Sequence, residues 1–193
     1  AAAGNIDFDS LILQAQNYCG RWAMFDAPRE LPTPKPRQAF QVIHKPLAAQ
    51  QYVVQLSPGP SATDADRYAA RLLTTIIGDD SGSRLFWELV DTGKAESASI
   101  GTQEYQGAGV FLTWLSCLPE LAAENLQQVA EIIQEAEADG VTEEELTQAK
   151  NKVCAQIVLN AERPTNRLFS VGNAWIQRRQ YKTHHKRNCL FYK

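Results

Sequence analysis

The fold of this chain is decided by one stretch near its middle, which reads GDDSGSRLFWELV over residues 78–90. Glycine, aspartate and serine make its first six residues a loop. Leu85, Phe86 and Leu89 then recur at the three- and four-residue spacing that marks one buried helix face. Ser83 stands just before this run, where a serine hydroxyl can cap a helix. The stretch therefore predicts a short amphipathic helix behind a polar loop.

A pair of strands is predicted directly after this helix. Residues 95–105 are small, tolerant of β-structure and weakly alternating, and residues 110–115 read VFLTWL, which is strongly strand-like. Gly107 and Gly109 separate the two runs. A helix that leads into an antiparallel pair is thus the unit around which the rest of the chain is organised.

Two strands and a longer helix are predicted before that unit. Ala39–His44 and Gln51–Ser57 carry β-branched residues, and Pro58 is expected to end the second strand. Thr63 is a suitable cap for a helix that ends at Gly78. The wide apolar stripe of this helix consists of Tyr68, Leu72, Leu73, Ile76 and Ile77.

Helices alone are predicted after the unit. Pro119 suits the first turn of a helix that runs to Gly140. Thr142 and Glu145 have the spacing of a capping box and open a second helix. Pro164 interrupts it, and residues 165–180 form a third. This order predicts an α+β fold in which helices pack on one face of an antiparallel sheet, without the alternation of a Rossmann domain.

Four segments are expected along the chain. Residues 1–25, with a helix capped by Asp7 or Asp9, resemble the end of a preceding unit. Residues 26–38 hold four prolines and predict an extended linker. Residues 39–181 form the main α+β domain. Residues 182–193 have no amphipathic period and predict a disordered or vector-derived tail, with a functional basic arm as the alternative.

Composition limits the classes of function. Hydrophobic residues make up 44% of the 193 residues, enough for a core, and no apolar run is long enough to span a bilayer. The net charge of −3 hides an acidic segment, 120–150, and a basic end, 162–193. The acidic segment fits a solvated helix face. Aromatic residues are not interleaved with the basic end, so no nucleic-acid partner is predicted.

No catalytic or metal-binding group is predicted in this chain. The four cysteines are widely spaced and fit isolated buried residues better than a disulfide framework or a zinc site. His44 has no second ligand at helical spacing, and the adjacent His184 and His185 point apart on a regular element. Neither His-Glu-x-x-His nor its inverse occurs, and neither a nucleophile elbow nor a Walker loop is present. The loop 78–83 fits a tight connector better than a phosphate or cation site.

Several of these segments, in this order, resemble the second half-domain of the pitrilysin/insulinase-type zinc metallopeptidases. The segments are GNID at 4–7, YCG at 18–20, SRLFWEL at 83–89, GVTEEEL at 140–146 and AK at 149–150. The family also includes mitochondrial processing peptidase and the core subunits of the cytochrome bc1 complex. The resemblance extends from about residue 4 to residue 181, and the proline-rich segment corresponds to the linker between the halves.

The resemblance implies a non-catalytic role for this half. In the family, the inverted zinc motif lies in the first half, and the second half closes over the peptide without binding metal. Zinc is therefore expected in a homologous partner half and no cofactor in this chain. Competent second halves also supply an arginine and a tyrosine that hold the substrate. Those positions fall at about Val90 and Glu96, so the resemblance assigns no such pair here.

Two functions remain open on this basis, and a third, a peptide- or nucleic-acid-binding module that works alone, rests only on the basic end. The first is the closing half of a zinc peptidase, with peptide hydrolysis by the partner half. The second is a structural or assembly subunit of the same fold without peptidase activity. For the first, strand alternation suggests Ser97, Ser99, Thr102 and Glu104 as residues that line the peptide cavity. An exposed apolar surface is also expected to make the isolated chain dimerise.

Overall fold

The computed structural model describes residues 1–26 and 35–180. The predicted tail and most of the predicted linker lie outside these residues. The elements in chain order are α1 (Phe8–Cys19), β1 (Gln51–Gly59), α2 (Arg67–Gly78), the π-helical turn η1 (Phe86–Val90), β2 (Ser97–Glu104), β3 (Gly109–Cys117), the 3₁₀ turn η2 (Pro119–Leu121), α3 (Ala122–Asp139), α4 (Glu143–Glu162) and α5 (Pro164–Arg178).

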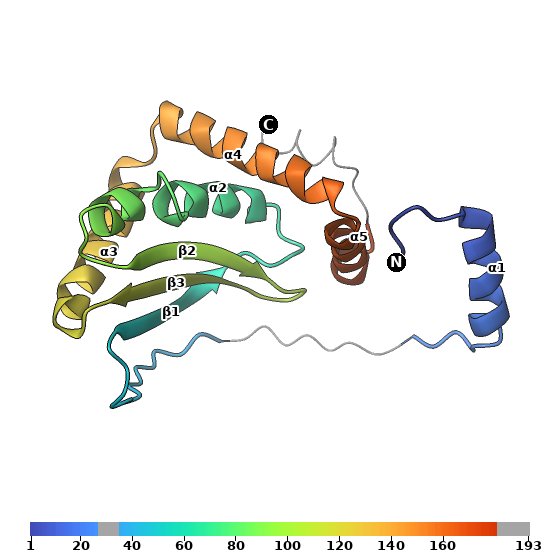
Figure 1. Cartoon of the computed structure of the whole chain (residues 1–193), viewed down its shortest axis with the longest axis horizontal. Helices are drawn as coiled ribbons and strands as arrows, with labels where there is room; N and C mark the ends of the chain where they lie inside the picture. The colour runs from blue at the N-terminus through green and yellow to red at the C-terminus, as the bar shows by residue number, and fades with distance from the viewer. Residues whose placement is uncertain (27–34, 181–193) are drawn as a thin grey trace.

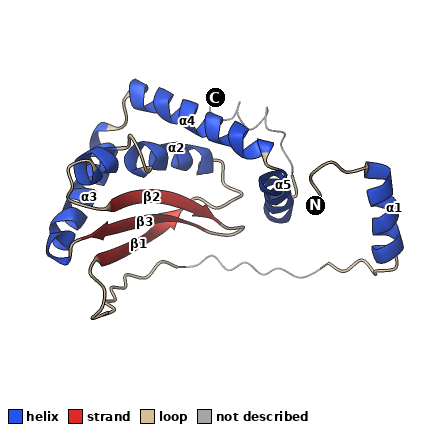
Figure 2. Ribbon diagram, viewed as in Figure 1, coloured by secondary structure: helices blue, strands red, loops and turns tan. Residues whose placement is uncertain are grey.

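The sheet has three antiparallel strands in the order β1-β3-β2. Ser97 of β2 lies opposite Ser116 of β3, and Gln51 of β1 lies opposite Cys117. β1 continues through Pro58, where a stop was predicted, because an edge strand tolerates a residue without an N–H group. The helices α2, α3 and α4 lie on one side of the sheet (Figure 1). Figure 2 shows the same arrangement with the helices in blue and the strands in red. The predicted α+β architecture is confirmed.

The helix α2 lies between the sheet and α4, so the main body has three layers (Figure 1). One core joins the sheet to α2, η1 and α3, and its fully buried side chains include Leu85, Leu89 and Leu115. A second core joins α2 to α4 and consists of Leu72, Ile76, Ala149 and Val153. The stripe predicted on α2 therefore serves two cores.

Most of the predicted caps and breaks of the helices are confirmed, and the cap predicted at Thr63 is the exception. Asp7 caps α1 through the backbone N–H groups of residues 9 and 10. α3 ends at Gly140, which has a φ of 77°. Thr142 and Glu145 form the predicted capping box at the start of α4. Pro164 begins α5. These signals are local, which explains why the sequence alone contains them.

The deciding stretch also folds largely as predicted. The Ser83 hydroxyl accepts the N–H of Phe86 at 3.2 Å and donates to the carbonyl of Asp79 at 2.7 Å. The difference is that the helix widens into a π-helical turn, in which the N–H of Asp91 bonds to the carbonyl of Phe86 at 2.8 Å.

Gly78, the last residue of α2, touches the sheet. A Cβ atom at this position would lie 2.4 Å from the backbone nitrogen of Ile100 in β2. No side chain fits in that space, and glycine is therefore the residue that lets α2 approach the strand so closely.

The prediction of a strand at Ala39–His44 is wrong. This segment forms no regular structure, and Phe40, Val42 and Ile43 are 91%, 70% and 68% exposed. A strand needs a hydrogen-bonded neighbour. β1, the nearest strand along the chain, pairs with β3 along its whole length, and in the described residues no strand pairs with its other edge. Composition supplied the β-propensity but could not supply a partner.

The start of α2 was also misplaced. Thr63 lies in a turn, where its hydroxyl is 3.0 Å from that of Ser61, and the helix begins only at Arg67. The carboxylate of Asp64 accepts the N–H of Asp66 at 3.0 Å, an Asx turn that delays the helix by one turn.

The helix α1 lies apart from the sheet (Figure 1). None of its residues is buried. The chain before it reaches α5, where the Cβ of Ala1 would lie 3.8 Å from a Cβ added to Gly172. That α1 ends a preceding half-domain stays a prediction.

Candidate functional site: the open face of the sheet

One face of the sheet carries no helix in the described part of the chain, and we call it the open face. Because paired residues of a sheet point to the same side, the pairing defines its members. Ala98 and Leu115 are paired and buried against the helices, so their neighbours Ser97, Ser99 and Trp114 point to the open face.

The larger part of the open face is apolar. Tyr52, Val54, Leu56 and Trp114 are 54%, 52%, 62% and 37% exposed. The rings of Tyr52 and Trp114 lie next to each other across β1 and β3, with centroids 5.9 Å apart. Aromatic and aliphatic side chains left in contact with water on a sheet are suited to cover the side chains of a peptide or a partner protein.

The other part of the open face is polar and lies at the start of β2. The hydroxyl of Ser116 is 2.7 Å from Oε1 of Gln50 and 3.3 Å from Oε2 of Glu96. The N–H of Glu96 donates to the carbonyl of Ser116 at 2.8 Å. Ser97 lies opposite Ser116 and adds a second hydroxyl. Ser116 itself is buried, so Glu96 and Ser97 are the groups at this end that can hydrogen-bond to an extended backbone.

The structure divides the four predicted site residues between the two faces. Ser97 and Ser99 are on the open face. Thr102 pairs with Phe111 on the helix-covered face, and Glu104 approaches Arg67 of α2, with 3.9 Å between Oε2 and Nε. Alternate residues of β2 point to opposite faces of the sheet, so these four side chains do not line one common surface. A role of Ser97 and Ser99 in peptide binding stays a prediction.

Val90 and Glu96 stand at about the positions where competent second half-domains of the similar peptidases have the arginine and the tyrosine that hold substrate. Val90 packs against the core between the sheet and the helices. Glu96 is exposed and interacts with Ser116. Neither side chain is a guanidinium or a phenol, and in this chain both serve the local structure.

The loop that precedes η1 is tied to α4 by ionic contacts of Arg84 and Lys152. Arg84 donates from Nε and Nη2 to the two carboxylate oxygens of Glu145 at 2.8 and 3.0 Å, and Nη2 also reaches the carbonyl of Gly140 at 3.1 Å. Lys152 also lies on α4, seven residues after Glu145. Its Nζ is 2.8 Å from Oδ2 of Asp79 and donates to the carbonyl of Ser81 at 2.8 Å.

The first of these contacts explains an altered acidity. Hydrogen bonding from Arg84 lowers the pKa of Glu145 to about 2, against the opposing effect of burial and with further hydrogen bonds from Thr142. Glu145 thus closes the capping box of α4 and binds the loop at the same time. The two segments SRLF and GVTEEEL are in direct contact through this carboxylate.

The described residues contain no group of three or more histidine, cysteine, aspartate or glutamate side chains that could hold a metal ion. His44 is exposed in the irregular segment before β1. His184 and His185 lie outside the described residues. Across residues 1–26 and 35–180, no helix combines the length and the apolar character needed to cross a bilayer.

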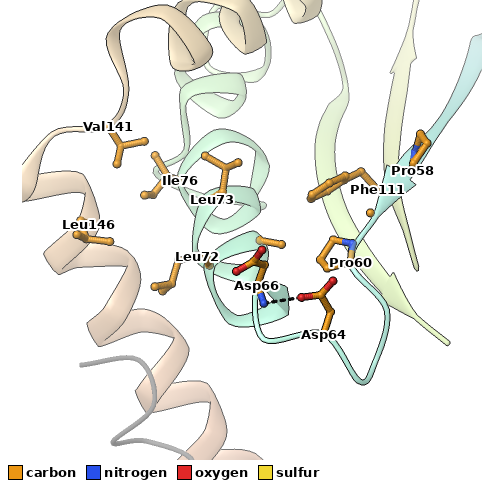
Figure 3. Close-up of a pocket in the computed structure, with 13 residues that line it drawn as sticks. Pro58, Pro60, Asp64, Asp66, Leu72, Leu73, Ile76, Phe111, Val141 and Leu146 are labelled. Carbon is orange, nitrogen blue, oxygen red and sulfur yellow. Dashed lines mark hydrogen bonds between the residues drawn. The ribbon is translucent and has the colours of Figure 1, made fainter. Parts of the chain in front are cut away.

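A groove of about 740 Å³ crosses the exposed flank of α2, and the sequence did not reveal it. Figure 3 shows Leu73 and Ile76 of α2 in its centre, Leu146 of α4 on one side and Phe111 with Pro60 on the other. The only hint in the sequence was the width of the apolar stripe, because Leu73 belongs to that stripe but remains 38% exposed.

The family model described as "Peptidase M16 inactive domain" matches residues 1–153. An uncharacterized zinc protease of Mycobacterium tuberculosis is 29% identical over 180 residues, which cover 90% of this chain and 41% of that protein. The chain therefore spans less than half the length of this relative.

Solved structures share the fold. A protease from Helicobacter pylori superposes with a TM-score of 0.78 at 19% identity and covers 98% of this chain and 47% of that one. A chain of complex III2 from Candida albicans superposes with a TM-score of 0.69 at 10% identity, over 76% of this chain and 37% of that one. At these identities the likeness concerns the fold alone.

Proposed function

This chain belongs to the family of peptidase M16 inactive domains, and from this we propose that it is the half of a zinc metallopeptidase that closes over a peptide held by a zinc-bearing homologous half. The zinc would belong to that partner half, where it polarises the scissile carbonyl and activates water. This chain would contribute the wall opposite the metal.

The open face is the observation that carries the proposal. It joins an apolar region around Tyr52 and Trp114 to a polar end at Ser97 and Glu96. An unfolded peptide offers both apolar side chains and a backbone that needs hydrogen bonds. A surface of mixed character that is rigidly held by a sheet can hold such a peptide without selecting one sequence.

A structural role is the second candidate. Val90 and Glu96 support it, because they replace the two side chains that hold substrate in competent members of the family. The shared fold with a complex III2 protein fits the same role. In that case the open face would be covered by another subunit rather than by a substrate.

The test uses the whole natural polypeptide, together with its zinc-bearing half if that half is a separate chain. Zinc content is measured by elemental analysis, and cleavage of a long unstructured peptide is followed with and without chelator. We expect about one zinc per pair of halves and cleavage that the chelator abolishes. A zinc-free and inactive protein would favour the structural role.

A substitution on the open face tests where the peptide binds. Trp114→Ala should raise the KM for a long peptide several-fold and change kcat little, because Trp114 would bind substrate without taking part in the chemistry. Trp87→Ala is the matched control, since Trp87 is 55% exposed on η1 in the helical layer. Equal KM values for both variants would exclude the open face as the peptide surface.

A further inference from the structure

A second cavity lies at the end of the helical layer, on the side of the sheet opposite to the open face. Its volume is about 420 Å³, and its walls come from α2, the end of α4 and the inner side of α5. The turn between α4 and α5, at residues 162–164, brings these walls together. Neither the peptidase role nor the structural role makes use of this cavity.

The walls of the cavity are positively charged. They include Arg71 of α2 and Arg167 and Arg178 of α5, and no aspartate or glutamate is among the described residues that line it. In the described part of the chain, no carboxylate lies within 4.0 Å of Arg71 or Arg167, whereas Arg67 and Arg84 each have a glutamate partner. Guanidinium groups stay protonated at any pH that the protein tolerates, so this charge is permanent.

Neutral hydrogen-bonding groups complete the lining. Asn173 and Gln177 stand on α5, one helical turn apart, and both line the cavity with Arg178. Asn160 at the end of α4 accepts a hydrogen bond from Asn166 of α5 at 3.4 Å, which links the two walls. Carboxamides can donate N–H groups toward the same point as the guanidiniums.

We propose that this cavity binds a phosphate or carboxylate group of a small ligand. Guanidinium groups bind both kinds of oxyanion in the same two-pronged way, which lysine does not reproduce. The volume exceeds that of a bare anion and falls within the range of small-ligand pockets, roughly 300–1,000 Å³. The aromatic ring of Phe169 and the side chain of Ile157 supply an apolar wall for the rest of such a ligand.

Binding would also join α5 to the body of the half-domain. Arg71 lies on α2, and Arg167 and Arg178 lie on α5, so an anion between them bridges two helices. A ligand that binds only the folded state raises its stability by mass action. The stability of the protein should therefore depend on the anion in a saturable way.

The experiment follows thermal unfolding of the whole polypeptide as inorganic phosphate, or succinate in a second arm, replaces chloride at constant ionic strength. We expect a saturable rise of Tm, about 3–7 °C at a hundred times the Kd. The double variant Arg71→Gln/Arg167→Gln should lose this rise. Without anion its Tm should not fall, because neither arginine has an ionic partner and their mutual repulsion is relieved.

Arg163→Gln is the matched control, because it removes one positive charge from an exposed position that does not line the cavity. It should keep the rise. Asn173→Asp is a second test that leaves the arginines in place, and its carboxylate should abolish the response by occupying them. A larger response to phosphate or to succinate identifies the preferred oxyanion.

Two outcomes would overturn the proposal. The first is the absence of a saturable rise with either anion in the wild-type protein. The second is an equal rise in the wild-type protein and in the double variant, which would mark a general salt effect on stability rather than a site.

Discussion

Glu145 connects two segments that lie 61 residues apart in the chain. Its carboxylate accepts two hydrogen bonds from Arg84 and one from the N–H of Thr142, so a single side chain closes a helix cap and binds the loop before η1. Each segment is recognisable in the sequence. Their contact is not, because nothing local relates one position to the other.

The acidity of Glu145 leads to a prediction about pH. Its folded-state pKa of about 2 lies below the usual value of 4.5, so between these values the unfolded state binds more protons. The contribution to stability is then complete above about pH 4.5 and is lost as the pH falls toward 2. Because the pair is partly exposed and screened, we expect Glu145→Gln to cost about 1–2 kcal/mol at pH 7.

Urea unfolding at pH 7 and at pH 3 measures this contribution. The difference between wild type and Glu145→Gln should shrink at pH 3. Glu143→Gln is the control, since Glu143 lies in the same first turn of α4 and has no side-chain partner among the contacts of the described residues. A loss at pH 7 that is equal for Glu143→Gln and Glu145→Gln would contradict this prediction.

Gly78 supports a second prediction at the level of one residue. A methyl group at Gly78 would meet the backbone nitrogen of Ile100 at 2.4 Å, so α2 would have to move away from β2. We expect Gly78→Ala to destabilise the protein by roughly 1–3 kcal/mol, the usual cost of overpacking.

Gly101 provides the contrast. It lies on β2, next to Ile100, and a methyl group there would meet nothing within 4 Å. Gly101→Ala should be neutral or slightly stabilising, since alanine restricts the unfolded chain. Both changes are compared by urea unfolding. If Gly78→Ala is as stable as Gly101→Ala, the close approach of α2 to the sheet is not needed for stability.

At the scale of elements, local signals predicted the structure well and long-range pairing did not follow from them. The caps at Asp7, Ser83 and Thr142 depend on residues two or three positions away, and all three are confirmed. The strand at Ala39–His44 depended on a distant partner and is absent. The start at Thr63 failed because a nearby aspartate forms a competing turn.

The candidate site shows the same limit. The sequence indicated β2 as the strand that carries the site. Side chains of a strand alternate between its two faces, so odd-numbered Ser97 and Ser99 lie on one face of β2. Even-numbered Thr102 and Glu104 lie on the other face, which the helices cover. The aromatic part of the open face was missed altogether, because Tyr52 and Trp114 meet only when β1 pairs with β3.

At the scale of the whole molecule, β1 and β2 are both edge strands of the sheet, and the outer edge of β1 is the more exposed to association because of its composition. β1 is nine residues long, carries no charged side chain, and in the described residues its outer edge has no partner. Proteins usually protect such an edge with charges, bulges or a covering segment. The exposed Tyr52, Val54 and Leu56 extend from this strand onto the open face. We propose that this edge makes the isolated chain associate with a second copy.

The prediction is a dimer whose population grows with concentration, and sedimentation velocity over a concentration series detects it.

Val54→Lys places a charge on β1 at a position that is 52% exposed, so it should shift the chain to the monomer without unfolding it. Leu159→Lys, on α4 and 63% exposed, makes a matched change away from the sheet and should leave the dimer intact. A wild-type chain that stays monomeric, or two variants that behave alike, would place the contact elsewhere. Loss of the dimer only in Val54→Lys would mean that β1, which borders the proposed peptide surface, is also the strand through which the isolated chain binds a second copy.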